Sequence, residues 1–242
     1  GKPMKMLLNF TIPVFIGNVF QQLYSMADAV IVGKFVGTKG LAAVGATGTI
    51  TFLIIGFLMG LTTGFTVLTS QKFGAGRMDE MRKTVGNAAI LSAVIAVIMT
   101  AVSMLGMHRL LVFMHTPEDI FDGAYGYIMI ICAGIFTQVL YNLVSSVLRA
   151  LGNSKTPLYF LILAAGLNIV LDLVFIIFFH WGAPGAAWAT VISQGVSGLL
   201  CLVYIWKAVP ELRMKREDWH FNKDIAAKQI SVGIPMGLQY SI

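Results

Sequence analysis

The stretch NIVLDLVFIIFF, residues 168–179, consists almost entirely of Val, Ile, Leu and Phe, yet it contains an acid at Asp172. An apolar run of this kind predicts a helix in a hydrophobic environment. Asn168 lies one helical turn before Asp172, so the two polar side chains share one face of that helix. Since a charge in such a run is costly, the acid calls for an explanation.

The composition of the whole chain places this run in a membrane. Of the 242 residues, 57% are hydrophobic and only 12% are charged, and the mean hydropathy is +0.81. This leaves too little polar surface to cover a water-soluble domain, whereas about 20 apolar residues span a bilayer as a helix. We therefore expect an all-α, polytopic membrane protein.

Six apolar runs are long enough to span a membrane. They cover residues 9–33, 41–71, 85–114, 122–148, 157–181 and 185–206. A charged segment follows, and a further apolar helix begins near Ile225. We expect a six-helix transmembrane domain over residues 1–222 and the truncated start of a seventh helix over residues 223–242. The first run reaches full length without a small-residue cleavage site, so it does not resemble a cleaved signal peptide.

The basic residues predict the orientation. If the N-terminus is cytoplasmic, 14 of the 17 Lys and Arg residues lie inside, and the three outside are Lys34, Lys39 and Arg109. Such a bias marks the cytoplasmic side. We expect a multi-pass protein of the cell's inner or plasma membrane. The charges are spread over loops, so the net charge of +6 gives no reason to expect a nucleic-acid partner.

Only two of the eleven acids lie within the predicted spans, Asp28 and Asp172. Each lies nine residues before the outer loop, roughly 13 Å below the outer surface at 1.5 Å per residue. An acid at such a depth is by default a hypothesis for an ion site. The alternative is a neutral carboxyl that joins helices by hydrogen bonds.

Four predicted spans also carry a stripe of polar residues at helical spacing. Interhelical hydrogen bonds explain one stripe, but four together favour an internal, water-accessible cavity. The side chains expected to line it are Asn18, Gln21, Gln22, Gln138, Asn142 and Gln194. In the first span, Pro13 removes a backbone donor and predicts a helix kink.

Two further patterns concern helix packing and the missing part of the protein. Gly56, Gly60 and Gly64 recur every fourth residue, a spacing that permits close packing of membrane helices. Residues 229–241 resemble residues 7–22, with Pro235 in the place of Pro13. This repeat predicts a second, parallel half, as in many secondary transporters. The partner of this chain would then be the missing lobe of the same protein.

Four segments carry a resemblance to a known family. They are SMADAVIVGKFVGTKGLAAVG (25–45), VLRALGNSKTPLYF (147–160), GLNIVLDLVFI (166–176) and GAPGAAWATVISQ (182–194). In this order they resemble the signature segments of multidrug and toxic compound extrusion (MATE) transporters, in particular the DinF-like branch, and the resemblance covers essentially the whole chain. It implies the N-terminal lobe of a twelve-helix antiporter that exports drugs or metabolites in exchange for Na⁺ or H⁺.

The resemblance also implies a coupling site for that ion. In the DinF-like branch the site takes an Asp from the first helix, an Asn and an Asp from the fifth, and a Thr from the sixth. These positions are Asp28, Asn168, Asp172 and Thr190 here. Gln21 and Pro13 match family positions near the cavity. The resemblance implies no cofactor besides the coupling ion, and the sequence does not choose between Na⁺ and H⁺.

A cavity with two acids and no basic residue at mid-depth predicts cationic, amphiphilic small molecules as substrates, in a protein surrounded by membrane lipid. A lipid-linked sugar flippase is one alternative, but it is expected to have basic residues in its cavity. A structural membrane bundle is another, although it needs neither the acids nor the stripes.

An enzyme is not expected, because no nucleophile motif occurs and the histidines lie in or beside loops without metal-ligand spacing: His108, His115, His180 and His220.

Overall fold

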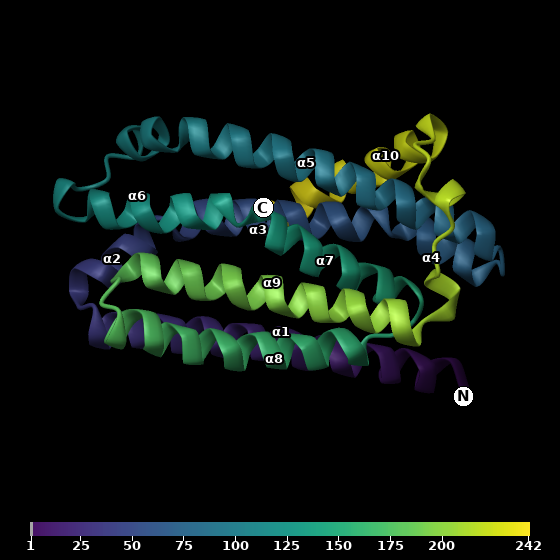
Figure 1. The fold of residues 1–242 in the computed structure, drawn as a ribbon, viewed down its shortest axis with the longest axis horizontal. Coiled ribbons are helices and arrows are strands. Elements are labelled where there is room, and N and C mark those ends of the chain that lie inside the picture. The colour runs from purple at the N-terminus through teal and green to yellow at the C-terminus, as the bar shows by residue number, and fades with distance from the viewer. Residues whose placement is uncertain (1) are drawn as a thin grey trace.

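The computed structural model describes residues 2–242 as a bundle of helices that run roughly along one long axis (Figure 1). No strand occurs in this described part of the chain. The α-helices are α1 Lys2–Phe35, α2 Thr38–Ala46, α3 Gly48–Phe65, α4 Val67–Gly74, α5 Met78–Phe113, α6 Glu118–Ala133, α7 Ile135–Ala150, α8 Lys155–Leu173, α9 Ala183–Ala208 and α10 Lys223–Ser241. A π-helix, η1 Val174–Phe178, extends α8, and two 3-10 helices, η2 Pro210–Leu212 and η3 Arg216–Trp219, lie between α9 and α10.

The six predicted spans are confirmed, with breaks that the hydropathy pattern does not show. Five helical segments are long and apolar enough to cross a membrane, and α6 with α7 makes a sixth that is bent by 46° at Gly134. A Cβ at Gly134 would lie 2.8 Å from the Val191 Cγ1 atom, so a larger residue there would force the Val191 side chain to move. At the break between α2 and α3, the Thr47 hydroxyl donates to the carbonyl oxygen of Val44 at 3.0 Å, a bond that bends helices.

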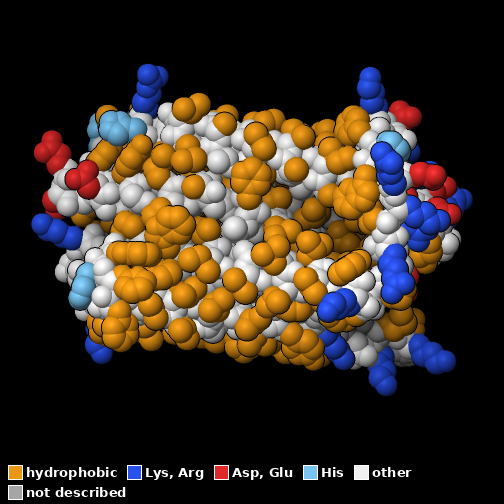
Figure 2. Space-filling view, viewed as in Figure 1, with side chains coloured by type: hydrophobic (Ala, Val, Ile, Leu, Met, Phe, Trp, Pro, Cys, Tyr) orange, Lys and Arg blue, Asp and Glu red, His pale blue; other side chains and the backbone are white. Residues whose placement is uncertain are grey.

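The surface fits a membrane environment. Large apolar side chains are exposed between the two ends of the bundle, and Val102 and Leu105 of α5 are 67% and 85% exposed. Charged side chains gather at the two ends instead (Figure 2). One end, on the right in Figure 1, holds the N-terminus, the turn between α4 and α5 and the linker between α9 and α10. We call it the basic end, since most Lys and Arg residues belong to its segments.

Helix α10 packs along α3 with almost no space between the two backbones. A Cβ at Gly56 would lie 2.7 Å from the Tyr240 carbonyl oxygen, and one at Gly60 would lie 2.7 Å from the Gly237 Cα atom. Such contacts confirm that the glycine repeat of residues 56–64 serves close helix packing. The partner helix is the one that follows the charged linker.

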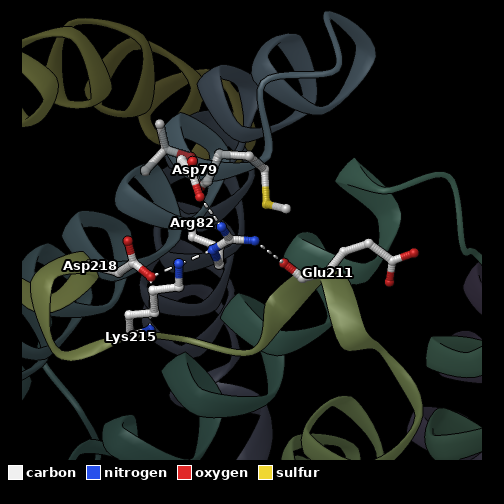
Figure 3. A network of polar contacts seen from close by, with 7 residues as sticks. Asp79, Arg82, Glu211, Lys215 and Asp218 are labelled. Atoms are coloured by element: carbon white, nitrogen blue, oxygen red, sulfur yellow. Dashed lines mark hydrogen bonds and ion pairs between the residues drawn. The ribbon is translucent and has the colours of Figure 1, made fainter.

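The linker is held against the start of α5 by Arg82 (Figure 3). The guanidinium forms an ion pair with Asp79, and its Nε lies 3.6 Å from Asp218 Oδ2. Its Nη1 donates to the Glu211 carbonyl oxygen at 3.5 Å. The side chains of Arg82 and Asp218 are only 13% and 5% exposed, so this charge pair is largely removed from water.

Two amide side chains extend this attachment into α10. Asn87 accepts a hydrogen bond from the Asn222 backbone N–H at 2.9 Å and donates to the His220 carbonyl oxygen at 3.4 Å. Gln229 donates to the carbonyl oxygens of Thr84 at 2.8 Å and Phe65 at 3.2 Å. The linker and the first turns of α10 are therefore bound to α3 and α5 by polar contacts. We call the set Arg82, Asn87, Asp218 and Gln229 the linker clamp.

Candidate ion-coupling site and cavity

The fold brings the two membrane acids together. Asp28 comes from α1 and Asp172 from α8, two helices that pack side by side, and the two carboxyl groups are direct neighbours. Asp172 is completely buried, and Asp28 is partly buried. Two like acids thus share one place in the interior of the bundle, away from the charged ends.

The other two predicted site residues join them. Asn168 lies one turn before Asp172 on α8, and its amide nitrogen donates to the Thr190 hydroxyl of α9 at 3.3 Å. That hydroxyl in turn donates to the Ala186 carbonyl oxygen at 3.1 Å, which fixes its orientation. Three helices therefore converge on one cluster, formed by Asp28, Asn168, Asp172 and Thr190.

Oxygen atoms of this cluster are buried without hydrogen-bond partners in the described chain. They are Asp28 Oδ1, Asn168 Oδ1 and both carboxyl oxygens of Asp172. Buried polar atoms in folded proteins almost always have a partner, so four such acceptors at one point require an explanation. A proton or a hard cation supplies what they lack, since carboxylate, amide and hydroxyl oxygens are the ligands such cations prefer.

The side chains of the cluster limit which metal ions can bind there. Within residues 2–242, no group of three or more His, Cys, Asp and Glu side chains lies together. Two acids with an amide and a hydroxyl offer only oxygen, which does not suit the softer ions that take His or Cys. Cys132 and Cys201 are buried and unpaired, away from any such cluster.

A π-helix follows the cluster directly. The α8 helix ends at Leu173, and residues 174–178 form η1, where the backbone has the wider π-helical turn. The Trp181 N–H then donates to the Phe175 carbonyl oxygen at 3.0 Å, which closes the turn. Short π-helical segments occur often at functional sites, because they displace one turn of side chains from the regular helical position.

Two tyrosines near the cluster were missed from the sequence. Tyr24, one turn before Asp28 on α1, neighbours Asp28 and also the amides of Gln21 and Gln194. Tyr127 of α6 is buried and lies close to both acids. The spacing of Tyr24 and Asp28 was a usable signal, since residues four apart share a helical face. Nothing in the sequence indicated Tyr127.

A cavity of about 580 Å³ lies beside the cluster. Five of the six predicted cavity residues line it, namely Asn18, Gln21, Gln138, Asn142 and Gln194, and so does Pro13, through which α1 continues unbroken. The sixth, Gln22, is exposed and does not line it. The four cluster residues do not line it either, so cluster and cavity are adjacent rather than one space. Tyr24, Gln21 and Gln194 lie between the two.

One basic residue lines the cavity, Arg149 in the last turn of α7, so the argument against a flippase from a cavity without basic residues does not hold. The position of Arg149 in this turn explains why the sequence counts it among the fourteen basic residues on the cytoplasmic side. It also continues the polar face of Gln138 and Asn142, eleven and seven residues earlier on the same helix. That face turns the guanidinium inward.

Comparisons with known proteins show to which family the chain belongs. The family model MatE matches residues 13–174. The chain is 33% identical to the probable multidrug resistance protein YpnP of Bacillus subtilis, in a match that covers all of this chain and 54% of the relative. It is 28% identical to YoeA, another probable multidrug resistance protein of Bacillus subtilis, over 95% of this chain and 51% of the relative. It also matches a solved structure titled as an outward-facing multidrug resistance MATE family transporter of the MOP superfamily.

That structure has a TM-score of 0.91 and 29% identity, and the match covers 99% of this chain and 53% of the other. The chain thus spans about half the length of the relatives that it matches. The apolar helices identify a multi-pass membrane protein. The resemblance to the MATE family is confirmed, and the chain belongs to the MatE family of membrane transporters.

Proposed function

We propose that this chain forms the first lobe of a secondary antiporter that exports cationic, amphiphilic small molecules in exchange for Na⁺ or H⁺. The coupling ion binds at Asp28, Asn168, Asp172 and Thr190, and the substrate enters the adjacent cavity. No catalytic step is part of this function. The proposal covers the whole protein, of which the chain supplies about half.

The observation that supports it best is the set of four buried oxygens without partners. An arrangement of two neighbouring acids is unfavourable unless protons or a cation neutralise it, so the state of the cluster depends on ion concentration. A ligand shifts a conformational equilibrium only through a difference in affinity between two states. A cluster that binds ions differently in two states of the lobe provides that coupling.

The substrate class follows from the walls of the cavity and from its relatives. Amide and hydroxyl groups alternate with apolar side chains, among them Phe10, Val14 and Met59. Such a lining suits molecules with an apolar body and a few polar groups. The relatives YpnP and YoeA are described as probable multidrug resistance proteins, which supports export of drug-like compounds.

The basic end is proposed to face the cytoplasm of a cell membrane, because basic residues gather there. A second lobe completes the transporter, since alternating access needs two units that move against each other around a central site. Membrane lipid surrounds both.

The test uses the full-length protein in vesicles loaded with a cationic dye. Gradients of Na⁺ and of H⁺ are applied separately, and dye movement is followed by fluorescence. We expect movement with one of the two gradients. Equal rates with and without gradients contradict antiport, and movement of a fluorescent lipid instead of the dye would identify a flippase.

A further inference from the structure

Two exposed lysines lie close together where α8 and α9 reach the basic end. The two helices run antiparallel and pack along each other (Figure 1). Phe160 of α8 and Tyr204 of α9 contact edge to face, with ring centroids 6.2 Å apart, and this contact sets the register of the helices. Lys155 precedes Phe160 by five residues on α8. Lys207 follows Tyr204 by three residues on α9, so both lysines lie at nearly the same level.

These lysines have no acidic partner among the described residues. Both side chains are exposed, and none of the ion pairs found in residues 2–242 involves Lys155 or Lys207. Their charges are therefore available to a ligand at the surface of the bundle.

Two tryptophans on α9 indicate the depth of the lysines in the membrane. Trp188 and Trp206 are exposed near the two ends of the helix, 18 residues apart, which corresponds to about 27 Å. This distance is close to the hydrocarbon thickness of a bilayer, roughly 30 Å, and tryptophan gathers at both of its boundaries. Trp206 thus marks the membrane boundary at the basic end. Lys207, the next residue, lies at the level of the lipid headgroups.

Apolar surface leads from the lysines toward the middle of the bundle. Tyr159, one turn after Lys155 on α8, is 64% exposed, and Trp206 beside Lys207 is 71% exposed. Farther along the two helices, large exposed side chains are aliphatic: Ile162, Leu163, Leu199, Leu200, Leu202 and Val203. The surface therefore offers positive charge at the level of headgroups and apolar groups at the level of acyl chains.

This surface lies apart from the helix that begins the proposed second lobe. Helix α10 packs on α3 and also contacts α4 and α5. In Figure 1, α10 lies beside α5 along one edge of the bundle, and α8 lies along the opposite edge. Lipid therefore reaches α8 and α9 from the side of the bundle away from α10.

From these observations we propose that the surface around Lys155 and Lys207 binds an anionic phospholipid. We call these two lysines, with Tyr159 and Trp206, the lipid subsite. A lysine ammonium donates charge-assisted hydrogen bonds to phosphate oxygens, and basic groups between membrane helices recognise anionic headgroups. An aromatic belt alone sets the depth of a protein and does not distinguish headgroups by charge. The inference goes beyond the proposed function, because lipid binding here needs neither the coupling ion nor the transported molecule.

The test measures contact between lipid and Trp206 in the full-length protein. Nanodiscs of unlabelled phosphatidylcholine receive increasing fractions of a brominated lipid, which quenches tryptophan emission on contact, and the signal of Trp206→Phe is subtracted. The brominated lipid is either phosphatidylglycerol, which is anionic, or phosphatidylcholine, which has no net charge. A lysine near the surface adds about fivefold to binding of an anionic lipid, so half-maximal quenching should need at least about fivefold less brominated phosphatidylglycerol than phosphatidylcholine.

Matched variants separate the subsite from a general effect of charge. Lys155→Gln with Lys207→Gln should bring the two lipids to within about twofold of each other. Lys83→Gln with Lys223→Gln removes two other exposed lysines, from α5 and α10, and should keep the preference for phosphatidylglycerol. The comparison of the two lipids in the unchanged protein decides the matter if a variant does not fold.

Three results would overturn the inference. Equal quenching by both lipids in the unchanged protein would mean that the surface does not select anionic headgroups. An equal loss of preference in both double variants would mean a general attraction to the basic end. Loss of quenching by both lipids in Lys155→Gln with Lys207→Gln would mean that the lysines only position Trp206.

A soluble competitor separates a lipid from a free phosphate group. Excess glycerol 3-phosphate should leave the quenching unchanged, because it lacks the acyl chains that the apolar surface accommodates. If it removed the preference for phosphatidylglycerol, the lysines would bind phosphate alone and the lipid assignment would be wrong. The measurement uses no ion gradient and no transported dye, so its result is independent of the transport test.

Discussion

The molecule contains two buried polar regions that are built in opposite ways. In the linker clamp, the Arg82 guanidinium faces the Asp218 carboxylate, and the amides of Asn87 and Gln229 are bonded to backbone groups. Only Arg82 Nε and Gln229 Oε1 of the clamp are buried without a hydrogen-bond partner in the described chain. In the cluster between α1, α8 and α9, Asp28 and Asp172 neighbour each other, and four oxygens have no partner in the described chain. One region pairs opposite charges, and the other brings like charges together.

The difference separates stability from function. Paired and hydrogen-bonded groups hold a structure in one state, because loss of any partner leaves a buried charge or donor unsatisfied. Neighbouring acids without partners do not stabilise the fold, and they persist where their occupancy by an ion or proton serves a purpose. The clamp therefore fixes the linker to the first lobe, while the cluster is able to change state.

The largest effect is expected from Asp172→Asn, which removes a charge and keeps the shape of the side chain. In the full-length protein, coupled export should fall to background, a loss of at least about tenfold, because the site can no longer exchange its proton or cation. The melting temperature in detergent should not fall, since the change removes a buried acid that has no partner. Dye export and thermal unfolding measure the two effects.

The control for this prediction is Asp122→Asn, which neutralises an exposed acid of α6 and should leave export unchanged. Asp28→Asn should act like Asp172→Asn, and the double variant should lose no more than either one, since neighbouring groups of one site are not additive. Additive losses would assign the two acids to separate roles. A lower melting temperature of Asp172→Asn with normal export would mean that the cluster stabilises the fold and does not couple transport.

A smaller effect is expected from Arg82→Met, which should lower stability instead of export. The variant leaves Asp218, which is 5% exposed, without its counterion, and we expect the free energy of unfolding to drop by about 3 kcal/mol, as for other broken buried pairs. The apolar stem of the side chain is kept, so the loss comes from the charge. Unfolding in detergent would show it as a lower melting temperature, whereas ion binding at the cluster should remain.

The double variant Arg82→Met with Asp218→Leu tests the cause. It removes both charges and should recover most of the lost stability, because a buried pair replaced by apolar groups is often neutral. Arg77→Met serves as the control. Arg77 immediately precedes α5, its side chain is 63% exposed, and its guanidinium lies 3.7 Å from the carboxylate of Glu80. If the double variant is no better than Arg82→Met, the stem of Arg82 rather than its charge holds the linker.

Much of the fold was predictable because hydropathy and charge report directly on a membrane. All six spans were found from apolar runs and short polar breaks. The breaks at Thr47 and Gly134 were not, since they depend on a hydroxyl bonded to its own helix and on the approach of Val191 from α9. The glycine repeat predicted close packing, but only the three-dimensional arrangement shows that α10 is its partner.

The candidate site was predictable in its acids and less so in its surroundings. An acid within an apolar run can be recognised in a single sequence, so Asp28 and Asp172 were found from their positions within the predicted spans. Tyr127 was not, because it lies on α6, far along the chain, and carries no unusual pattern. Arg149 was counted with the cytoplasmic charges because it lies near a helix end, and the direction of its side chain depends on the rotation of α7. Tertiary packing decides both.

The smallest effect is expected from Glu80→Gln. Glu80 pairs with Lys72 at 2.8 Å, a shorter distance than that between Arg82 and Asp218, yet its side chain is 50% exposed. Water and salt screen exposed pairs, so we expect the melting temperature to change by less than about 1 °C, and by even less in high salt. A shift as large as that of Arg82→Met would mean that distance, rather than burial, sets the strength of pairs at the basic end. A small shift would support burial as the source of the clamp's strength, since both pairs lie at the same end of the bundle and each has one member on α5.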